Sequence, residues 1–232
     1  MMKLLALSLM FAICCLGSYG QSTSNKPLPN KSPEPTRGSG DRATGYEINK
    51  RPLVDFARYV NDLLDKKQVD LASAFVVNAS GKLNEDGKFD LKSFRWGEIS
   101  SQDPQIVGVV KGVIEAINDS GYLQFLKDVG GKDFNLMLQQ DDANITAVIQ
   151  SEMEGETRAR TVSSALGLMV SIAKKAKSSD GTDQRDKDDL VLLDNATFEA
   201  VGKKLVIRFQ VPKAIALVMI QRTLAEQRTQ PK

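Results

Sequence analysis

Three successive segments of this chain share one order of hydrophobic patterns: two short stretches of alternating apolar residues, then a longer stretch with apolar residues at helical spacing. Period-two alternation predicts a half-buried strand, and apolar residues three and four positions apart predict an amphipathic helix. Strand pairs that are each followed by a helix favour a largely antiparallel sheet. We therefore predict an α+β fold with helices packed on one face of the sheet, in which an initial helix is followed by three β-β-α units.

The initial helix is expected over residues 52–67, where a proline suits the first turn. The first unit then has predicted strands at 71–78 and 89–99. Its helix begins at Asp103, because aspartate is a favoured N-cap, and ends at Gly121, because glycine is favoured just after a helix. Within this helix we expect Val110 to face the sheet and Lys111 to face solvent.

The second unit has alternating runs at 134–139 and 145–149 on either side of an Asp-Asp-Ala-Asn turn. A helix is expected over 156–177, followed by an acidic loop at 178–189. The third unit has strands on either side of a Gly202-Lys203 turn, and Pro212 opens the last helix. The apolar stripe predicted for the 156–177 helix consists of Val162, Ala165, Leu166, Met169, Ile172 and Ala176.

The N-terminus has the order of a secretory signal, with Lys3 before an apolar run of 13 residues and small residues up to Gly20. A membrane-spanning helix needs about 20 residues, so we expect residues 1–20 to be a signal peptide cleaved before Gln21. A retained anchor and a lipid on a cysteine are the alternatives. Ile13 before Cys14 argues against lipidation, since that processing resembles a pattern with a small residue at this point.

Residues 21–52 are rich in proline, serine, asparagine and lysine and have no apolar periodicity, which predicts a flexible linker. Residues 53–232 contain no second proline-rich stretch. We therefore predict that they form a single α+β domain.

The sequence has no histidine, and its two cysteines, Cys14 and Cys15, lie inside the predicted signal. An exported chain without them cannot form disulfides, a Ser-His-Asp triad or a His-ligated zinc site. We expect no cofactor and no metal. The 31 basic and 29 acidic residues nearly balance, which argues against a nucleic-acid partner.

Two patterns with catalytic or metal-binding potential are weak. Ser171 and Lys174 match Ser-x-x-Lys, but the Ser-Asp-Asn and Lys-Thr-Gly elements that accompany it in the β-lactamases are absent. Acidic clusters at 85–90 and 180–189 lack the spacing of a calcium-binding loop. We therefore predict that the protein is not an enzyme.

Phe94 and Trp96 are the candidate partner-binding residues. They fall in the opposite phase to Phe89 and Leu91, so either a bulge intervenes or both faces of the strand are covered. One interpretation places both rings in the core beneath a helix. The other makes them an exposed aromatic anchor for a partner.

The order of an apolar N-terminal segment, a Pro- and Lys-containing linker and a C-terminal α+β domain resembles TonB-type energy-transducer proteins of the bacterial envelope. The stretch 74–152, with a Gly81-Lys82-Leu83 turn before strand, helix and hairpin, is similar to their domain. The resemblance implies an exported protein, in the periplasm or outside the cell, whose partner is an unidentified envelope protein and which contacts a membrane only if the N-terminal segment is retained. The alternative is a carrier or sensor of an apolar small molecule held between sheet and helices.

Overall fold

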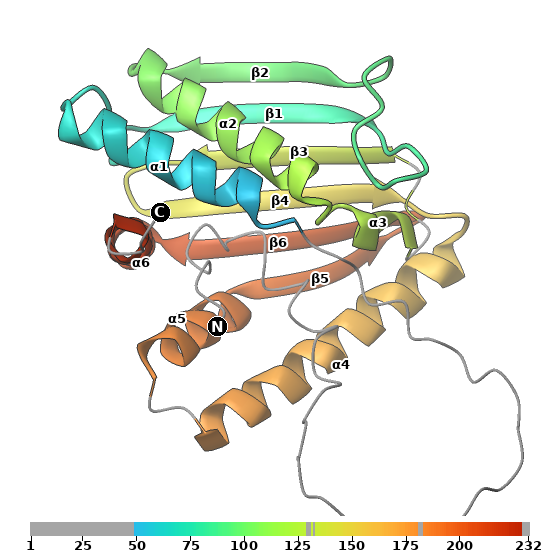
Figure 1. Ribbon diagram of the computed structural model, residues 1–232. Helices are drawn as coiled ribbons and strands as arrows, with labels where there is room; N and C mark the ends of the chain where they lie inside the picture. The colour runs from blue at the N-terminus through green and yellow to red at the C-terminus, as the bar shows by residue number, and fades with distance from the viewer. Residues whose placement is uncertain (1–48, 129–130, 132, 181–182, 229–232) are drawn as a thin grey trace, which may run out of the picture.

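A computed structural model of the chain describes residues 49–128, 131, 133–180 and 183–228 (Figure 1). The predicted signal peptide and all but the end of the predicted linker lie outside these residues. In chain order the elements are α1 (Arg51–Asp65), β1 (Phe75–Lys82), β2 (Arg95–Ser101), α2 (Pro104–Ser120), α3 (Gln124–Asp128), β3 (Asp133–Gln140), β4 (Asn144–Glu152), α4 (Glu156–Asp180), α5 (Gln184–Asp194), β5 (Ala196–Val201), β6 (Lys204–Pro212) and α6 (Lys213–Arg228).

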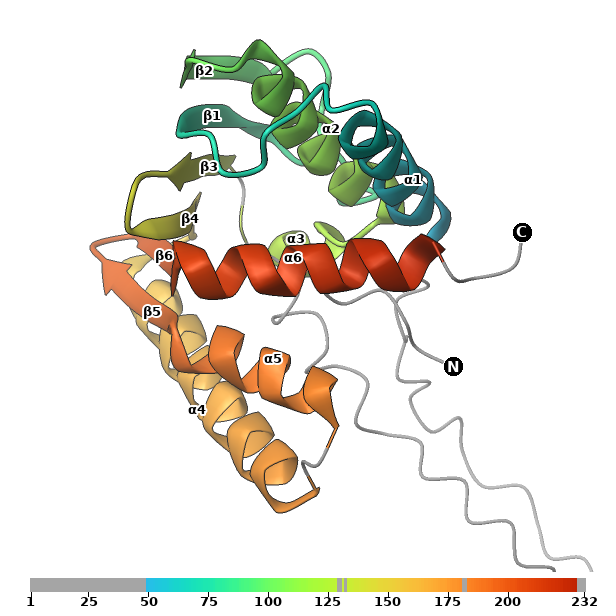
Figure 2. The same cartoon turned by 90° about the vertical axis from the view of Figure 1, so that its left-hand side faces the viewer.

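The strands form one six-stranded sheet in the order β2-β1-β3-β4-β6-β5, and every neighbouring pair is antiparallel. Seen along the sheet, the helices all lie on the same side (Figure 2). The predicted α+β fold, with an initial helix and three β-β-α units, is therefore confirmed. Two short helices, α3 before the second unit and α5 before the strands of the third, were not predicted from the sequence patterns.

The helix-facing side of the sheet carries the core. Across the strands, Val77, Leu138, Ala147, Phe209 and Ala196 pair in one row, from β1 to β5. Three members of this row, in β1, β4 and β6, have no exposed surface. Because alternate residues of a strand face opposite sides, the same register leaves the other face of the sheet to mostly polar side chains.

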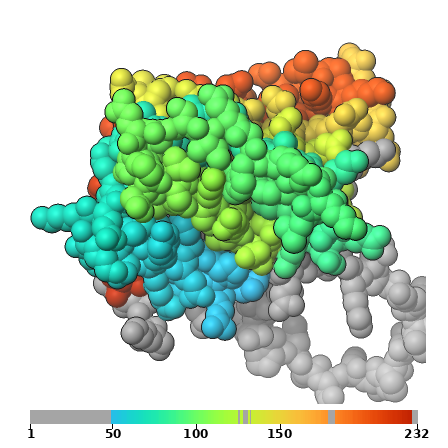
Figure 3. All heavy atoms as spheres, turned by 90° about the horizontal axis from the view of Figure 1, so that it is seen from above, coloured from blue at the N-terminus to red at the C-terminus, as the bar shows by residue number. Residues whose placement is uncertain are grey.

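Helix α2 has the ends expected from its sequence. The Asp103 side chain accepts a hydrogen bond from the Gln105 amide at 2.8 Å, and Gly121 takes a left-handed conformation with φ of 82°. Val110 is buried as predicted. The prediction for Lys111 is wrong: this side chain is half-buried, and its ammonium lies 5.1 Å from the centre of the Trp96 ring. Figure 3 shows α2 in light green packed against α1 in blue.

Two strands in the first unit begin later than predicted because aspartate turns precede them. Asp70 accepts a hydrogen bond from the Ala72 amide at 2.9 Å, and β1 starts only at Phe75. Asp90 accepts one from the Lys92 amide at 3.1 Å, and β2 starts only at Arg95. The turn at 90–94 accounts for the change of phase between Phe89 and the later aromatic residues.

The predicted acidic loop at 178–189 contains most of α5 instead. Asp183 caps this helix, with its side chain accepting from the Arg185 amide. The helix buries Leu192 and Leu193 at its C-terminal end. An acidic first turn stabilises a helix through its dipole, so the composition that suggested a loop is also typical of a helix start.

The predicted stripe of α4 is correct only in part. Val162 and Leu166 are buried, but the other four predicted positions are exposed. The buried side is completed by Ala159, Val170 and Ala173. This helix is apolar on two sides, so spacing alone could not determine which side faces β5.

Candidate functional site

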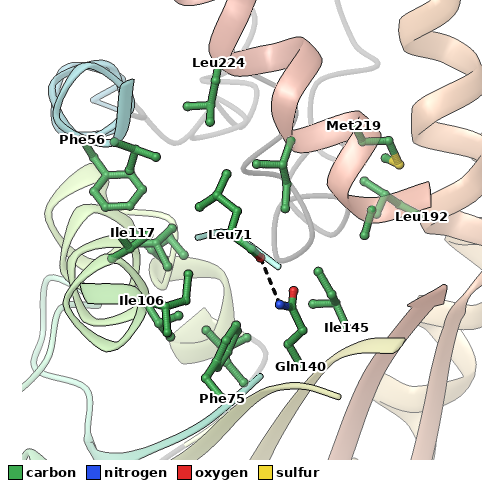
Figure 4. A pocket seen from close by; sticks show the side chains of 17 residues that line it. Phe56, Leu71, Phe75, Ile106, Ile117, Gln140, Ile145, Leu192, Met219 and Leu224 are labelled. Carbon is green, nitrogen blue, oxygen red and sulfur yellow. Dashed lines mark hydrogen bonds between the residues drawn. The ribbon is translucent and has the colours of Figure 1, made fainter. Parts of the chain in front are cut away.

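In the described part of the chain, an apolar cavity of about 140 Å³ lies between the helices and the sheet. Figure 4 shows it from close by. Side chains from β1, β3 and β4 form its floor, those of α1 and α2 one wall, and those of α6 the opposite wall. Leu71, from the connection between α1 and β1, and Leu192 of α5 complete the lining.

The cavity follows from the direction of α6. This helix starts directly after β6, where the Lys213 amide donates to the Ala143 carbonyl at 2.8 Å, and it runs away from the sheet rather than across it (Figure 2). A helix in this orientation covers little of the strands beneath it. Its far part contacts α1 instead, where Asn61 donates to the Leu224 carbonyl at 2.9 Å. A space therefore stays open between α6, the α1–α2 pair and the floor.

The walls of the cavity are apolar. Phe56 of α1 and Ile106 of α2 point toward it from one side, and Met219 of α6 from the other (Figure 4). Phe75 and Ile145 rise from the sheet. These five side chains are all buried, so core residues form the walls of this partly open cavity.

Gln140, at the end of β3, is the only polar side chain among the described residues that line the cavity. It is 2% exposed. Its Nε2 donates to the Leu71 carbonyl at 3.0 Å and to the Ser73 carbonyl at 2.7 Å. Its Oε1 points into the cavity (Figure 4), and within the described residues no donor reaches that oxygen. The site thus presents one hydrogen-bond acceptor in apolar surroundings.

Sequence reasoning missed Gln140, although a signal was present. Phe134, Leu136 and Leu138 alternate along the predicted strand, and Gln140 continues the same phase. A polar residue at the next inward position of a buried strand needs a hydrogen-bond partner in the core. The sequence could not show that the other lining residues, from four helices and the α1–β1 connection, surround the same cavity, since they come from distant segments.

The candidate partner-binding residues lie elsewhere. Phe94 stacks on Phe89 with ring centres 4.6 Å apart, and Phe94 meets Trp96 edge to face at 5.1 Å. Both are half-buried and pack against the edge of the main core, and neither lines the cavity. The rings thus lie at the edge of the core, with the Lys111 ammonium over the indole, and a partner-binding role for Phe94 and Trp96 stays a prediction.

The structure does not bring Ser171 and Lys174 together. The Ser171 hydroxyl donates to the Gly167 carbonyl of its own helix at 2.9 Å, while the Lys174 ammonium pairs with Asp194 at 2.9 Å. Among the described residues no group of three or more acidic side chains is placed to hold a metal ion.

The acidic side chains of α5 are used in ion pairs. The Lys177 ammonium lies 2.8 Å from Asp186 and 2.5 Å from Asp189. Burial raises the pKa of Asp189, and this effect outweighs the lowering by Lys177. Burial and the ion pair with Lys177 thus have opposite effects on the pKa of Asp189. Burial dominates because the Asp189 side chain is only 13% exposed and Lys177 is shared with Asp186.

Comparison of the chain with protein-family models, curated proteins and solved structures found no match. None of the helices in the described ranges is both long enough and apolar enough to cross a membrane.

Proposed function

We propose that the protein binds a small apolar molecule in the cavity between α1, α2, α6 and the sheet, as its carrier or sensor. The observation that supports this proposal is a cavity of about 140 Å³ lined, apart from Gln140, by apolar side chains. Protein interiors are close-packed, and side chains that line an unfilled space lose the contacts that neighbouring atoms would supply. An apolar ligand would recover much of that loss, and cavities of about 150 Å³ bind molecules the size of benzene.

The lining also favours binding over catalysis. It has no ionisable side chain and no nucleophile among the described residues. General acid–base and covalent catalysis both need such a group within hydrogen-bond reach of the substrate. The proposal is therefore a non-enzymatic one.

Ligand-induced stabilisation tests the proposal. We expect benzene or toluene to raise the midpoint of thermal unfolding of the protein in proportion to the logarithm of ligand concentration, with about 2.7 kcal/mol of stabilisation at a hundredfold excess over Kd. Ala216→Leu should remove this effect, because Ala216 is fully buried in the lining and the added carbons would occupy the cavity.

Val218→Leu is the matched control. Val218 lies on the same helix but is 51% exposed and does not line the cavity, so the variant should keep the ligand effect of the wild type. Absence of any ligand effect in the wild type would contradict the proposal. An equal effect in Ala216→Leu would also contradict it, since binding would then lie outside this cavity.

A second candidate is the partner-binding role expected from the resemblance to TonB-type proteins. The observation that favours it is the face of the sheet opposite the helices, which no described element covers (Figure 2). This face carries a shallow groove lined by residues of β1 to β4 and β6, among them Asn78, Met137 and Arg208. Export to the periplasm or the cell exterior, an envelope partner and likeness to TonB stay predictions.

Site-specific photo-crosslinking in cells tests this second candidate. A photoreactive residue at Met137, in the groove, should form an adduct with an envelope protein. The same residue at Glu115, exposed on α2 on the helical side, should not. Adducts at neither position, or equally at both, would contradict binding through the open sheet face.

A further inference from the structure

Gln140 holds a fixed orientation in the cavity. Its two N–H groups are both used, one on the Leu71 carbonyl and one on the Ser73 carbonyl. Exchanging the amide nitrogen and oxygen would place Oε1 against two other acceptors and lose both hydrogen bonds. The connection between α1 and β1 therefore fixes Gln140 so that only its carbonyl oxygen faces the cavity (Figure 4).

This oxygen needs a partner that the described residues do not supply. Water can reach this oxygen, because the cavity is only partly enclosed and Gln140 Oε1 is not among the fully buried atoms without a partner in the described residues. A ligand that fills the cavity would displace that water, and an acceptor then left without a hydrogen bond costs about 1–3 kcal/mol. A water at this oxygen is weakly held, because a stable buried water makes two to four hydrogen bonds and Gln140 has the only polar side chain of the described lining. A donor carried by an otherwise apolar ligand satisfies the oxygen and leaves the rest of the ligand in hydrocarbon surroundings.

We infer that the ligand is an apolar molecule, about the size of one substituted aromatic ring, that carries a single hydroxyl or N–H donor to Gln140 Oε1. This inference rests on the proposed function and narrows it. The cavity volume sets the size, and the single acceptor sets the polarity. A site built to bind a hydroxyl discriminates against analogues without one, because its own polar group is then left unpaired.

Calorimetric titration of the protein with phenol, toluene and anisole tests the inference. The three ligands have similar shapes, but only phenol carries a donor. We expect the wild type to prefer phenol over toluene and anisole. The ratio of the toluene Kd to the phenol Kd should fall by about tenfold in Gln140→Met, because methionine matches the length of glutamine without its acceptor.

A crystal structure of the wild type with phenol supplies a test that needs no variant, in case loss of the bonds to Leu71 and Ser73 prevents Gln140→Met from folding. The phenol oxygen should lie within about 3 Å of Gln140 Oε1. A phenol in the cavity with its hydroxyl directed elsewhere would overturn the inference.

The outcomes separate the inference from the proposed function. If phenol and toluene bind the wild type with equal affinity and Ala216→Leu abolishes both, the cavity binds ligands and only the inference fails. If none of the three ligands binds, the proposed function fails and the inference fails with it. A phenol preference that persists in a folded Gln140→Met would mean that the phenol hydroxyl donates to another acceptor, and it would overturn the inference alone.

Discussion

At the scale of single residues, aspartate side chains fix where elements begin and turn. Asp70 and Asp90 close turns before β1 and β2, and Asp103 and Asp183 cap α2 and α5. Aspartate does this because its short carboxylate accepts hydrogen bonds from backbone amides two or three residues onward. Such bonds compete with the strand ladder, which explains why both strands of the first unit are shorter at their start than their apolar residues predict.

Asp141 in the β3–β4 turn gives a prediction about pH. Its carboxylate accepts from the amides of Ala143 at 2.8 Å and Asn144 at 2.7 Å, and these bonds lower its pKa below 3.8. A lowered folded-state pKa favours the ionised form, so this stabilisation is present above about pH 4 and is lost as pH falls through the folded value. In urea unfolding, Asp141→Ala should therefore be less stable than the wild type at pH 7, with a smaller difference at pH 2.5. A difference that does not change with pH would contradict this assignment.

Asp189 gives the opposite dependence. Its pKa is raised above 3.8 by burial, with Lys177, Asp186 and Asp188 as its charged neighbours and Arg222 of α6 bound to Asp188. The folded state then holds the proton more tightly than the unfolded state, so the contribution of Asp189 to stability is present at low pH and declines as pH rises from about 4 through the folded pKa.

Asp189→Asn tests whether the stability contribution of Asp189 declines as pH rises. The variant cannot ionise at this position, so its stability relative to the wild type should increase as pH rises from 3.5 to 6, measured by urea unfolding. Lys177 keeps an ion pair with Asp186 at 2.8 Å in the variant. If the stability of the wild type instead increases relative to the variant over this pH range, attraction to Lys177 outweighs burial.

At the scale of elements, α4 shows how one helix can have two apolar sides of which only one is used. Leu166 is 2% exposed against the core, whereas Leu168 is 63% exposed. The two residues are about 200° apart around the helix axis at 3.6 residues per turn. Contact with β5 and the neighbouring α5 selects the buried side.

A matched pair of substitutions in α4 checks which side is buried. Leu166→Ala should lower the free energy of unfolding by about 2–5 kcal/mol, as expected for removing a buried leucine side chain. Leu168→Ala should change it by less than about 0.5 kcal/mol, because the site is on the surface. Chemical denaturation of both variants measures the two values. Equal losses would mean that α4 is rotated relative to the structure.

At the scale of the whole molecule, the sheet has one covered face and one open face, and the cavity lies under the covered one. The helices do not form a uniform layer: α1 and α2 lie over the β2 half, α4 packs on β5, and α6 leaves the sheet between them (Figure 2). The cavity lies where the α1–α2 pair and α6 are not in contact. It therefore belongs to the arrangement of the three β-β-α units and not to any one of them.

The whole chain also carries the prediction of export. We expect the mature protein to begin at Gln21, because the apolar run before it is too short to span a membrane and is followed by small residues. Intact-mass spectrometry of the protein from the expressing cells should show a chain without Cys14 and Cys15. An intact N-terminus, or an added lipid mass on either cysteine, would contradict the prediction.

The sequence by itself determined the class of fold and the order of the initial helix and the three β-β-α units, but not the short helices α3 and α5. Period-two and helical spacing are local properties, and the caps at Asp103 and Gly121 act within a few residues, so the three β-β-α units and the ends of α2 could be predicted. The acidic composition of 178–189 was ambiguous, since it suits both a loop and the start of a helix. Gln140 carried a signal in its phase, but nothing local shows what surrounds it.

Only the tertiary structure decided which side of α4 is buried, where α6 points and that a cavity results. These features depend on contacts between distant parts of the chain, such as the bond from Asn61 to the Leu224 carbonyl, 163 residues away in the sequence. The orientation of Gln140 likewise depends on two carbonyl groups 67 and 69 residues away. Spacing along the chain records which residues prefer burial, whereas the angle between packed elements fixes how completely the space between them is filled.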